Sequence, residues 1–305
     1  MIDVQRLLVL REVAHAGSFA GAAAELRRTP SAVSQQIAAL ERGAGVPLVE
    51  RSTRGVVLTD AGRLLLAAAD AVHAELQTAA RQLRDLQASG PQTLTVATFA
   101  SAGEPLLAPA LTEVTTTSNT IDVTVIEAEP DDALASLRSG GADLVLVYHF
   151  HTRQPPGHWL AIAGPGAYIP LVDDHIRLLV PASHPLASRD AAAPPELAGD
   201  RWIQGWGDTG AVLDALAATS GFRPRIACRS SDYRFMSALV SAGVGVALIP
   251  RLGLPDNPQV RDLAITPQPI RYVGIYRPSR RWQHPAADRL LAALRHQAAT
   301  MNGTA

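Results

Sequence analysis

Apolar side chains in the first 45 residues recur at helical spacing in three short segments, which Gly, Ser, Thr and Pro residues separate. The third segment, 31–41, has the sequence SAVSQQIAALE. One face of the predicted helix carries Val33, Ile37 and Leu40. The other face is polar but uncharged, with Ser31, Ser34 and Gln35, and Gln36 beside them. Solvated helix faces usually carry Glu, Lys and Arg, so these shorter side chains indicate a contact with another molecule.

The two helices around Thr29-Pro30 and the segment after them predict a winged helix-turn-helix. Ser18 is placed to cap a helix over 19–28, and Pro30 begins the next one, where its missing N–H costs nothing. Residues 46–59, VPLVERSTRGVVLT, then predict two short strands around a turn at 52–55. Ser and Gln both donate and accept hydrogen bonds, and short Ser side chains let a helix approach DNA closely. The pattern favours DNA reading over an ordinary solvated face.

Two arginines flank the predicted hairpin, Arg51 and Arg54. Wing arginines of this kind contact phosphates or enter the minor groove. For Arg51 the alternative is a surface ion pair with Glu50 or Glu41. The hairpin is therefore a second candidate DNA contact beside the helix.

A long helix is predicted over 60–87, with Thr59 as its cap. Its apolar residues follow the heptad spacing of a coiled coil and are Leu65, Ala69, Val72, Leu76, Ala79, Leu83 and Leu86. No apolar segment before residue 94 stands out to cover this stripe, so a second chain is the expected partner. The alternative is burial against the helix's own domain. ASGPQ, at 88–92, has the composition of a linker.

From residue 93 the apolar pattern changes to strands that alternate with helices. TLTVATF, IDVTVIEA and ADLVLVY are strand-like, and helical segments near 104–116 and 130–139 separate them, which predicts a parallel sheet. A second set of strands and helices follows a Pro- and Gly-rich crossover at 154–170, and RYVGIY and a helix near 285–299 close the chain. Two α/β lobes are expected, with the last strand and helix returning to the first lobe. Ligands of open α/β sheets bind at the strand carboxyl ends.

Composition narrows the possible functions. The net charge of −1 by itself favours neither nucleic acid nor an acidic substrate, and all 27 basic residues are Arg. The single cysteine, Cys228, cannot form an intramolecular disulfide, which fits a reducing cytoplasm. The longest apolar runs are far shorter than the ~20 residues of a membrane span, and the N-terminus is amphipathic rather than a signal peptide. No P-loop, G-x-S-x-G or strand-following G-x-G-x-x-G occurs, and the nine His show no zinc-ligand spacing.

Residues 19–62, FAGAAAELRRTPSAVSQQIAALERGAGVPLVERSTRGVVLTDAG, resemble the N-terminal domain of LysR-type transcriptional regulators. The family's GSF-x-x-AA-x-x-L, S-x-x-S-x-x-I-x-x-LE, G-x-x-L-x-ER and LT-x-AG elements occur in order with their spacing intact. The match covers residues 2 to about 88, and VSAGVGVALIPR resembles a strand of the family's second lobe. The resemblance implies a winged helix-turn-helix, a long linker helix that dimerises, and a two-lobed periplasmic-binding-protein-like α/β domain that senses a small molecule.

The resemblance also implies site residues. DNA contacts fall on Pro30, Ser31, Ser34 and Gln35, with Arg51 and Arg54 in the wing. Gln35 stands where many members carry Arg, and Ser31 where Pro is common, so the base preference does not transfer. Gly43 and Ala44 replace the usual Glu-Leu and are expected to weaken the helix end, since Gly costs ~1 kcal/mol relative to Ala in a helix interior.

For the effector, family geometry points to the residues Thr98, Phe99, Ala100, Ser101, Tyr148, His149, Gln204, Trp206, Ser231 and Asp232. Ser101 and its neighbouring amides resemble an anion-holding helix N-terminus, and His149 is a pH-dependent donor. The alternatives are a plain N-cap for Ser101, a surface histidine for His149, and a core or interface position for Trp206. His149-Phe150-His151 lacks another nearby ligand, so no metal and no resident cofactor are expected.

The sequence predicts a cytoplasmic, sequence-specific transcriptional regulator and not an enzyme. An effector between the lobes is expected to change the geometry of a homodimer or homotetramer on operator or promoter DNA. RNA polymerase is a further candidate partner, and a membrane is not. Two alternatives stay open: a DNA-binding regulator whose C-terminal domain only oligomerises, and a solute-binding or enzymatic α/β protein whose N-terminal segment dimerises it.

The chain is predicted to divide into 1–58 for DNA binding, 59–88 for the linker helix, 89–92 for a linker and 93–305 for the effector domain. Within the effector domain, lobe I is expected at about 93–160 and 267–305 and lobe II at about 161–266.

Overall fold

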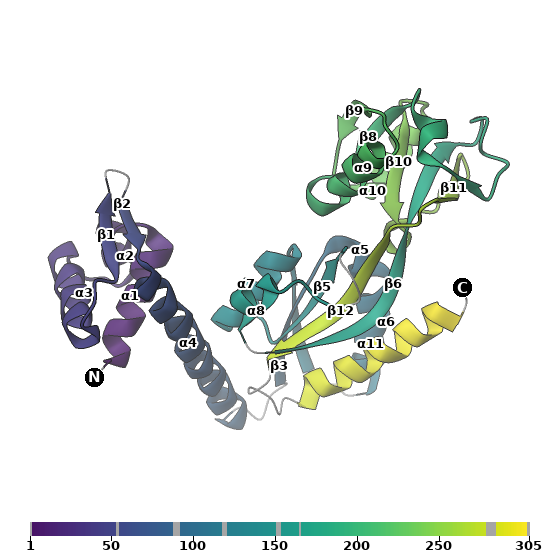
Figure 1. The fold of residues 1–305 in the computed structure, drawn as a ribbon. Helices are drawn as coiled ribbons and strands as arrows, with labels where there is room; N and C mark the ends of the chain where they lie inside the picture. The colour runs from purple at the N-terminus through teal and green to yellow at the C-terminus, as the bar shows by residue number, and fades with distance from the viewer. Residues whose placement is uncertain are drawn as a thin grey trace.

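The computed structural model describes residues 2–52, 55–87, 92–117, 121–150, 154–164, 166–278 and 285–303. A small helical domain at the N-terminus is followed by one long helix and then by a two-lobed α/β domain (Figure 1). The architecture predicted from the sequence is confirmed.

The N-terminal domain contains the predicted tandem of helices and the hairpin. Its elements are α1 (Val4–Ala16), α2 (Phe19–Glu25), α3 (Pro30–Ala44), β1 (Val49–Ser52) and β2 (Gly55–Leu58). Asp3, Ser18 and Thr29 cap the three helices, each accepting a hydrogen bond from the backbone N–H three residues further on. α2 ends before the predicted end at Arg28. The expected weakening of α3 at Gly43 is not seen, because the helix continues to a left-handed cap at Gly45.

The hairpin is tied to the rest of this domain by backbone contacts. Val56 N donates to Gly17 O at 2.9 Å. A Cβ on Gly55, whose φ is +128°, would lie 2.4 Å from the same oxygen, so only glycine fits there. Glu41 of α3 accepts a hydrogen bond from Leu48 N at 2.8 Å. These contacts hold the hairpin at a fixed position beside α3.

The long helix α4 (Asp60–Gln87) is partly covered by its own chain. Leu65 packs against the core of the N-terminal domain, and Ala69 is fully buried. The expectation that no segment of the same chain covers the heptad stripe is therefore wrong for its first turns, where α1 packs on α4. Leu76 and Leu83 are 52% and 58% exposed, so the later turns of the stripe are open in this single chain.

The C-terminal α/β domain is built on a mixed sheet. Lobe I comprises β3 (Gln92–Thr98), α5 (Ala100–Ala102), the π-helical turn η1 (Gly103–Leu107), α6 (Ala108–Thr117), β4 (Ile121–Glu127), α7 (Pro130–Ser139), β5 (Leu144–His149), α8 (His158–Ala163), β12 (Ile270–Pro278) and α11 (Pro285–Gly303). Lobe II comprises β7 (Ala191–Ala192), η2 (Pro194–Leu197), β8 (Arg201–Gln204), α9 (Gly207–Thr219), β9 (Arg225–Arg229), α10 (Tyr233–Ser241), β10 (Val246–Pro250), η3 (Arg251–Gly253) and β11 (Val260–Ile265). With β6 at Gly166–Pro181, the strand order is β4-β3-β5-β12-β6-β10-β8-β9.

One strand, β6 (Gly166–Pro181), runs through both lobes. It pairs with β12 through His175 and with β10 from Ile176 onwards, so the sheet changes lobe between these two residues. Lobe I therefore extends further along the chain than the expected boundary near 161. The segment 154–170 contains α8 and the start of β6, where the sequence suggested only a crossover. The prediction that the last strand and helix return to lobe I is confirmed, because β12 pairs with β5 and α11 packs on α6.

Each lobe has its own core. In lobe I the buried side chains of β3 and β5 meet those of α6 and α11, with Leu94, Leu146 and Leu290 at 0% exposure. In lobe II, Trp202 and Leu248 pack beneath α9. Across the described residues of the chain, no helix combines the length and apolar character needed to cross a bilayer.

Candidate DNA-reading surface and effector cleft

The helix α3 presents the predicted reading face to solvent. Val33, Ile37 and Leu40 are at most 1% exposed and lie in the domain core. On the opposite side Pro30, Ser31 and Gln35 are exposed, and Ser34 is half-buried. The Ser31 hydroxyl lies 3.1 Å from the capping Thr29 hydroxyl, which orients it at the start of the helix. The fold thus brings together the four α3 residues that the sequence proposed.

The wing is placed beside this helix, but its arginine side chains are not described. Arg51 lies on β1 opposite Val56, while its side chain and all of Arg54 fall outside the described residues. Glu41, one of the alternative partners of Arg51, accepts hydrogen bonds from the Leu48 and Val49 amides. The wing assignment of the two arginines stays a prediction.

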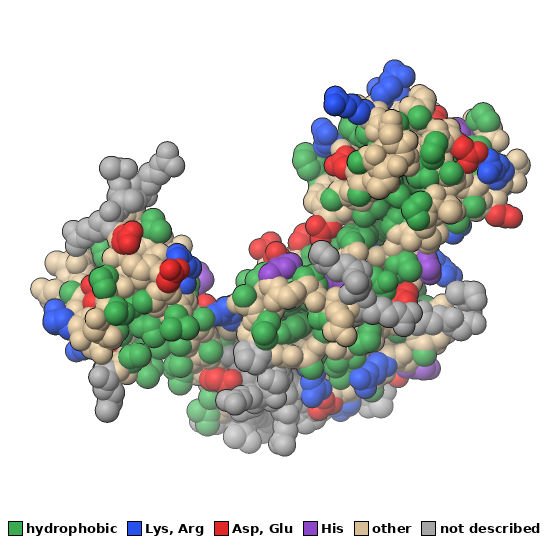
Figure 2. Space-filling view, viewed as in Figure 1, with side chains coloured by type: hydrophobic (Ala, Val, Ile, Leu, Met, Phe, Trp, Pro, Cys, Tyr) green, Lys and Arg blue, Asp and Glu red, His purple; other side chains and the backbone are tan. Residues whose placement is uncertain are grey.

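A cavity of about 660 Å³ lies between the two lobes. Lobe I contributes the carboxyl ends of β3, β4 and β5, and lobe II contributes the segments that follow β8 and β9. The carboxyl ends of the parallel strands therefore meet at one edge, as expected for an open α/β sheet. Figure 2 shows acidic and histidine side chains over α7 and α8, on the side of lobe I that faces lobe II.

Seven of the ten proposed effector residues line this cavity, and they are Phe99, Ala100, Ser101, Tyr148, His149, Trp206 and Ser231. The other three do not. Thr98 is 4% exposed and donates to Phe99 O. Gln204 points into lobe II, where its side-chain amide donates to Gly210 O and Asp214. Asp232 accepts from two backbone amides as the N-cap of α10. These three side chains stabilise the walls of the cavity.

The structure also decides between the alternatives for individual residues. Ser101 accepts a hydrogen bond from Arg271 at 2.9 Å and does not cap α5. His149 is 2% exposed, against the rings of Trp159 and Tyr272, so it is not a surface histidine. Trp206 is 62% exposed and is not a core residue. His151 lies outside the described residues, and no described group of three His, Cys, Asp or Glu side chains is arranged to hold a metal.

The most buried ionic contact at the cavity was missed from the sequence. Arg271 on β12 and Asp174 on β6 have side chains 1% and 0% exposed. Arg271 Nε and Nη2 donate to Asp174 Oδ2 at 2.9 and 2.6 Å, and Asp174 Oδ1 accepts from Leu252 N. The guanidinium also stacks over Phe99 and Tyr148, 4.9 and 4.8 Å from the ring centroids. The pair thus joins β12 to β6, and its further hydrogen bonds reach Ser101 of lobe I and the Leu252 amide of η3.

Other cavity residues come from elements that the sequence reasoning did not connect to it. Glu129 follows β4 and accepts a hydrogen bond from Tyr148 Oη at 2.7 Å. Ligands of open α/β sheets bind at strand carboxyl ends, so its position after β4 was a signal that could have found it. Trp159 and His158 come from α8, which had no sequence signal of its own. Burial, and then the hydrogen bond to Glu129, raise the pKa of Tyr148, so its phenol remains a donor.

Both domains match one protein family. Residues 4–63 match the family described as "Bacterial regulatory helix-turn-helix protein, lysR family", and residues 87–299 match "LysR substrate binding domain". The second match alone spans more than half of the chain. The chain belongs to the LysR family. This LysR-family protein is a DNA-binding transcriptional regulator with an effector-binding domain, and it is not an enzyme.

Relatives of this LysR-family protein match it along most of their length. It is 27% identical to the DNA-binding transcriptional dual regulator OxyR of Escherichia coli (strain K12), over 90% of this chain and 88% of OxyR. It is 30% identical to a probable hydrogen peroxide-inducible genes activator of Mycobacterium leprae (strain TN), over 86% and 84% of the two chains. Full-length OxyR of Pseudomonas aeruginosa shares the fold, with a TM-score of 0.61 at 20% identity over 97% and 98% of the chains.

A solved structure of full-length CbnR with its target DNA also shares the fold, with a TM-score of 0.59 at 21% identity, over 97% of this chain and 100% of CbnR. The LysR family match and these full-length similarities agree with the order of elements seen here. The resemblance read from the sequence motifs is thereby confirmed.

Proposed function

We propose that this regulator reads a specific operator through Pro30, Ser31, Ser34 and Gln35 of α3, with Arg51 and Arg54 of the wing on the flanking backbone. The observation that carries this proposal is the two-sided character of α3. Val33, Ile37 and Leu40 are buried, while the opposite face carries short, uncharged side chains that are largely accessible. A groove that repels carboxylates and requires close approach favours such a face.

The test is a gel-shift titration with the intergenic DNA beside the protein's own gene. Ser34→Ala combined with Gln35→Ala should reduce discrimination against unrelated DNA by about tenfold or more, since a bidentate base contact contributes about 1–3 kcal/mol. The control pair is Gln5→Ala with Gln77→Ala, which removes exposed polar groups from α1 and α4. Undiminished specificity in the α3 variant would show that this face does not read the bases.

We further propose that the interlobe cavity binds the effector through the seven lining residues that the sequence identified. A ligand there contacts both lobes, so it binds one relative lobe position more tightly than another and shifts the regulator between assembly states. The single cysteine, Cys228, excludes an intramolecular disulfide switch in this chain. Although some relatives are named as hydrogen peroxide-inducible genes activators, we propose a non-covalently bound small molecule here.

A metabolite panel read by melting temperature tests the cavity, because a ligand at 100 times its Kd stabilises by about 2.7 kcal/mol. Trp206→Ala should abolish the shift that a hit produces while leaving operator binding unchanged. Phe235→Ala is the matched control, since Phe235 is also exposed, at 49%, but does not line the cavity. A ligand shift that survives in Trp206→Ala places the effector elsewhere.

We propose that the regulator acts in the cytoplasm as a homodimer or homotetramer, with the exposed turns of α4 at the interface. In this proposal residues 1–58 read DNA, residues 59–88 join two chains, and residues 93–305 sense the effector. A C-terminal domain that only oligomerises is the competing function, and the melting-temperature panel separates the two.

A further inference from the structure

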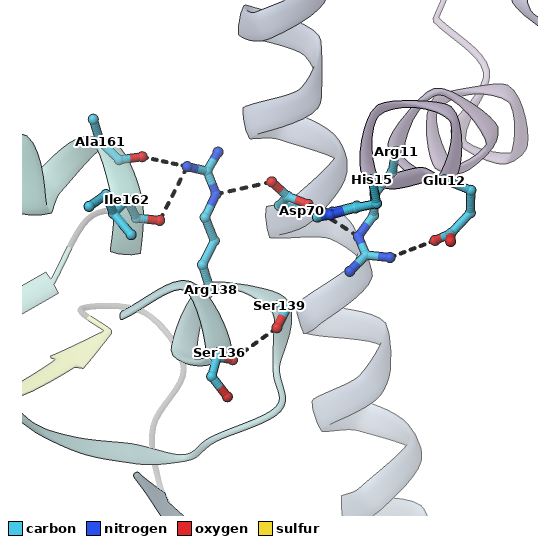
Figure 3. Close-up of polar contacts among 9 residues, drawn as sticks. All are labelled: Arg11, Glu12, His15, Asp70, Ser136, Arg138, Ser139, Ala161 and Ile162. Atoms are coloured by element: carbon cyan, nitrogen blue, oxygen red, sulfur yellow. Dashed lines mark hydrogen bonds and ion pairs between the residues drawn. The ribbon is translucent and has the colours of Figure 1, made fainter. Parts of the chain in front are cut away.

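The linker helix carries a buried carboxylate that contacts both domains (Figure 3). Asp70 of α4 is 8% exposed. Its Oδ1 accepts a hydrogen bond from Arg11 Nε of α1 at 3.1 Å, and its Oδ2 lies 3.4 Å from Arg138 Nε of α7. One carboxylate is thus held by a cation from the DNA-binding domain and a cation from lobe I.

Arg138 connects this carboxylate to the wall of the effector cavity. Its Nη1 donates to the carbonyl oxygens of Ala161 and Ile162, near the end of α8 (Figure 3). Carbonyls in the last turn of a helix have no partner within the helix, and they attract a cation. His158 and Trp159, in the first turn of the same short helix, line the cavity. A displacement of α8 by a ligand therefore acts directly on the Arg138 guanidinium.

Arg11 connects the carboxylate to the reading helix. It is paired with Glu12 at 2.6 Å as well as with Asp70, and its side chain is 13% exposed. The neighbouring residues of α1, Leu10 and Val13, lie in the same buried core as Ile37 of α3. The orientation of α1 on the linker helix therefore sets the orientation of α3.

The two domains are close-packed where these charges meet. Ala74 of α4 is fully buried. A Cβ added to Gly140, which ends α7, would lie 3.2 Å from Ala74 Cα. These small residues let the two backbones approach closely. Close packing of this kind favours one relative orientation of α4 and α7 over a continuous range of orientations. Removing one cation from a buried carboxylate is strongly unfavourable, so this arrangement depends on Arg138 staying in place.

We propose that the Arg11–Asp70–Arg138 contact is the connection by which the effector cavity controls the orientation of the DNA-binding domain. The inference rests on the proposed function, because it requires an effector in the cavity. Without effector, α8 holds Arg138 against Asp70 and the two domains keep one orientation. An effector that moves α8 withdraws Arg138, which releases the domain. By thermodynamic linkage, a variant that breaks the contact changes operator affinity and effector affinity together.

The test is a distance measurement by pulsed electron paramagnetic resonance in the full-length protein. Spin labels are placed by Gln5→Cys and Thr112→Cys in a Cys228→Ser background, and labelled chains are diluted with unlabelled ones so that distances lie within one chain. The effector-free protein should give a narrow distribution. Arg138→Gln and Asp70→Asn should each broaden or shift it and change operator affinity by about fivefold or more. Arg189→Ala, in an exposed pair with Glu196 of lobe II, is the control.

A double-variant cycle separates direct coupling from general damage. Arg138→Gln should have little further effect on the distances in the Asp70→Asn background, because its partner is already gone. Independent, additive effects overturn the proposal, as does an unchanged distribution in Arg138→Gln. Should Asp70→Asn not fold, Arg138→Gln with Ala74→Leu supplies the second perturbation. A cavity that binds no metabolite refutes the proposed effector function, while unchanged distances in a protein that binds both ligand and operator refute only this connection.

Discussion

Arg271 and Asp174 show how single residues position the effector cleft. Asp174 sits on β6, which runs through both lobes, and Arg271 sits on β12 of lobe I. Their pair also reaches Ser101 and the Leu252 amide. The charges are out of water, so the pair is stable only while both partners are present. Neither residue stands out in the sequence, because a lone Arg or Asp in a strand is more often exposed.

Arg271→Gln should lower the free energy of unfolding of the effector domain by about 3–5 kcal/mol, because it leaves Asp174 buried without a cation. Urea denaturation measures the change. Arg234→Gln is the control, since Arg234 pairs with Glu104 at an exposed position and should change stability by less than about 1 kcal/mol. If both variants lost the same free energy of unfolding, burial of the Arg271–Asp174 pair would not be the reason for its effect on stability.

His73 makes stability depend on pH. Burial, and then the positive charge of Arg11, lower its pKa from 6.5, while Glu12 and Asp70 oppose the shift and His15 adds to it. The unfolded chain therefore binds the proton more readily than the folded one. Stability should fall as the pH drops through about 6.5 and towards the lower folded pKa. His73→Gln should reduce the slope of melting temperature against pH in this range, and an identical slope would exclude His73 as a source.

At the scale of elements, α4 packs against two different helices of its own chain along its length. Its first turns are covered by α1, around the fully buried Ala69, and its middle packs on α7 at Ala74. The heptad residues Leu76 and Leu83 stay exposed beyond these contacts. Burial against the helix's own chain is thus seen in the first turns, and the exposed later turns are the ones proposed to pair with a second chain.

Leu76→Ser combined with Leu83→Ser should dissociate the proposed dimer, since each buried leucine contributes about 1.5–3 kcal/mol. Light scattering coupled to gel filtration should show the mass falling to that of one chain. Leu64→Ser is the matched control on the same helix, because Leu64 is 73% exposed and lies off the heptad stripe. If the double variant keeps its mass, the interface lies outside the heptad stripe.

At the scale of the molecule, a net charge of −1 has to coexist with binding to a polyanion. The positive charge that contacts DNA must therefore be local, and the proposed wing arginines are where it is expected. Basic side chains that bind DNA phosphates release counterions from the duplex, so the affinity for DNA depends steeply on salt concentration. Long-range attraction contributes little to a protein with so small a net charge.

Operator affinity should fall steeply as salt rises, with a linear relation between the logarithms of affinity and salt concentration. Arg51→Gln should weaken binding to all sequences alike and reduce the magnitude of the slope by about one, as expected for the loss of one phosphate contact. Arg177→Gln in lobe II, where Arg177 pairs with Asp262, should leave the slope unchanged. An unaltered slope in Arg51→Gln removes this residue from the phosphate contacts.

Local features of the fold were predictable from the sequence. The cap Ser18, the start of α3 at Pro30, and the βαβαβ order of lobe I depend on hydrogen bonds and apolar spacing among neighbouring residues. Seven of the cavity residues were implied by the family resemblance, and they lie at or shortly after strand ends, which can be read from the chain. The family motifs are local too.

Only the tertiary structure decided which distant side chains meet. Arg271 and Asp174 are 97 residues apart, and Asp70 of α4 contacts residues of two other helices, α1 and α7. Gln204 turns inward and Trp206 outward, although they are two positions apart in the chain. Burial and charge pairing depend on which segments pack together, and periodicity carries no information about that choice. The sequence by itself determined the family, most of the elements and the proposed reading face, and packing decided how the cavity, the linker helix and the DNA-binding domain are connected.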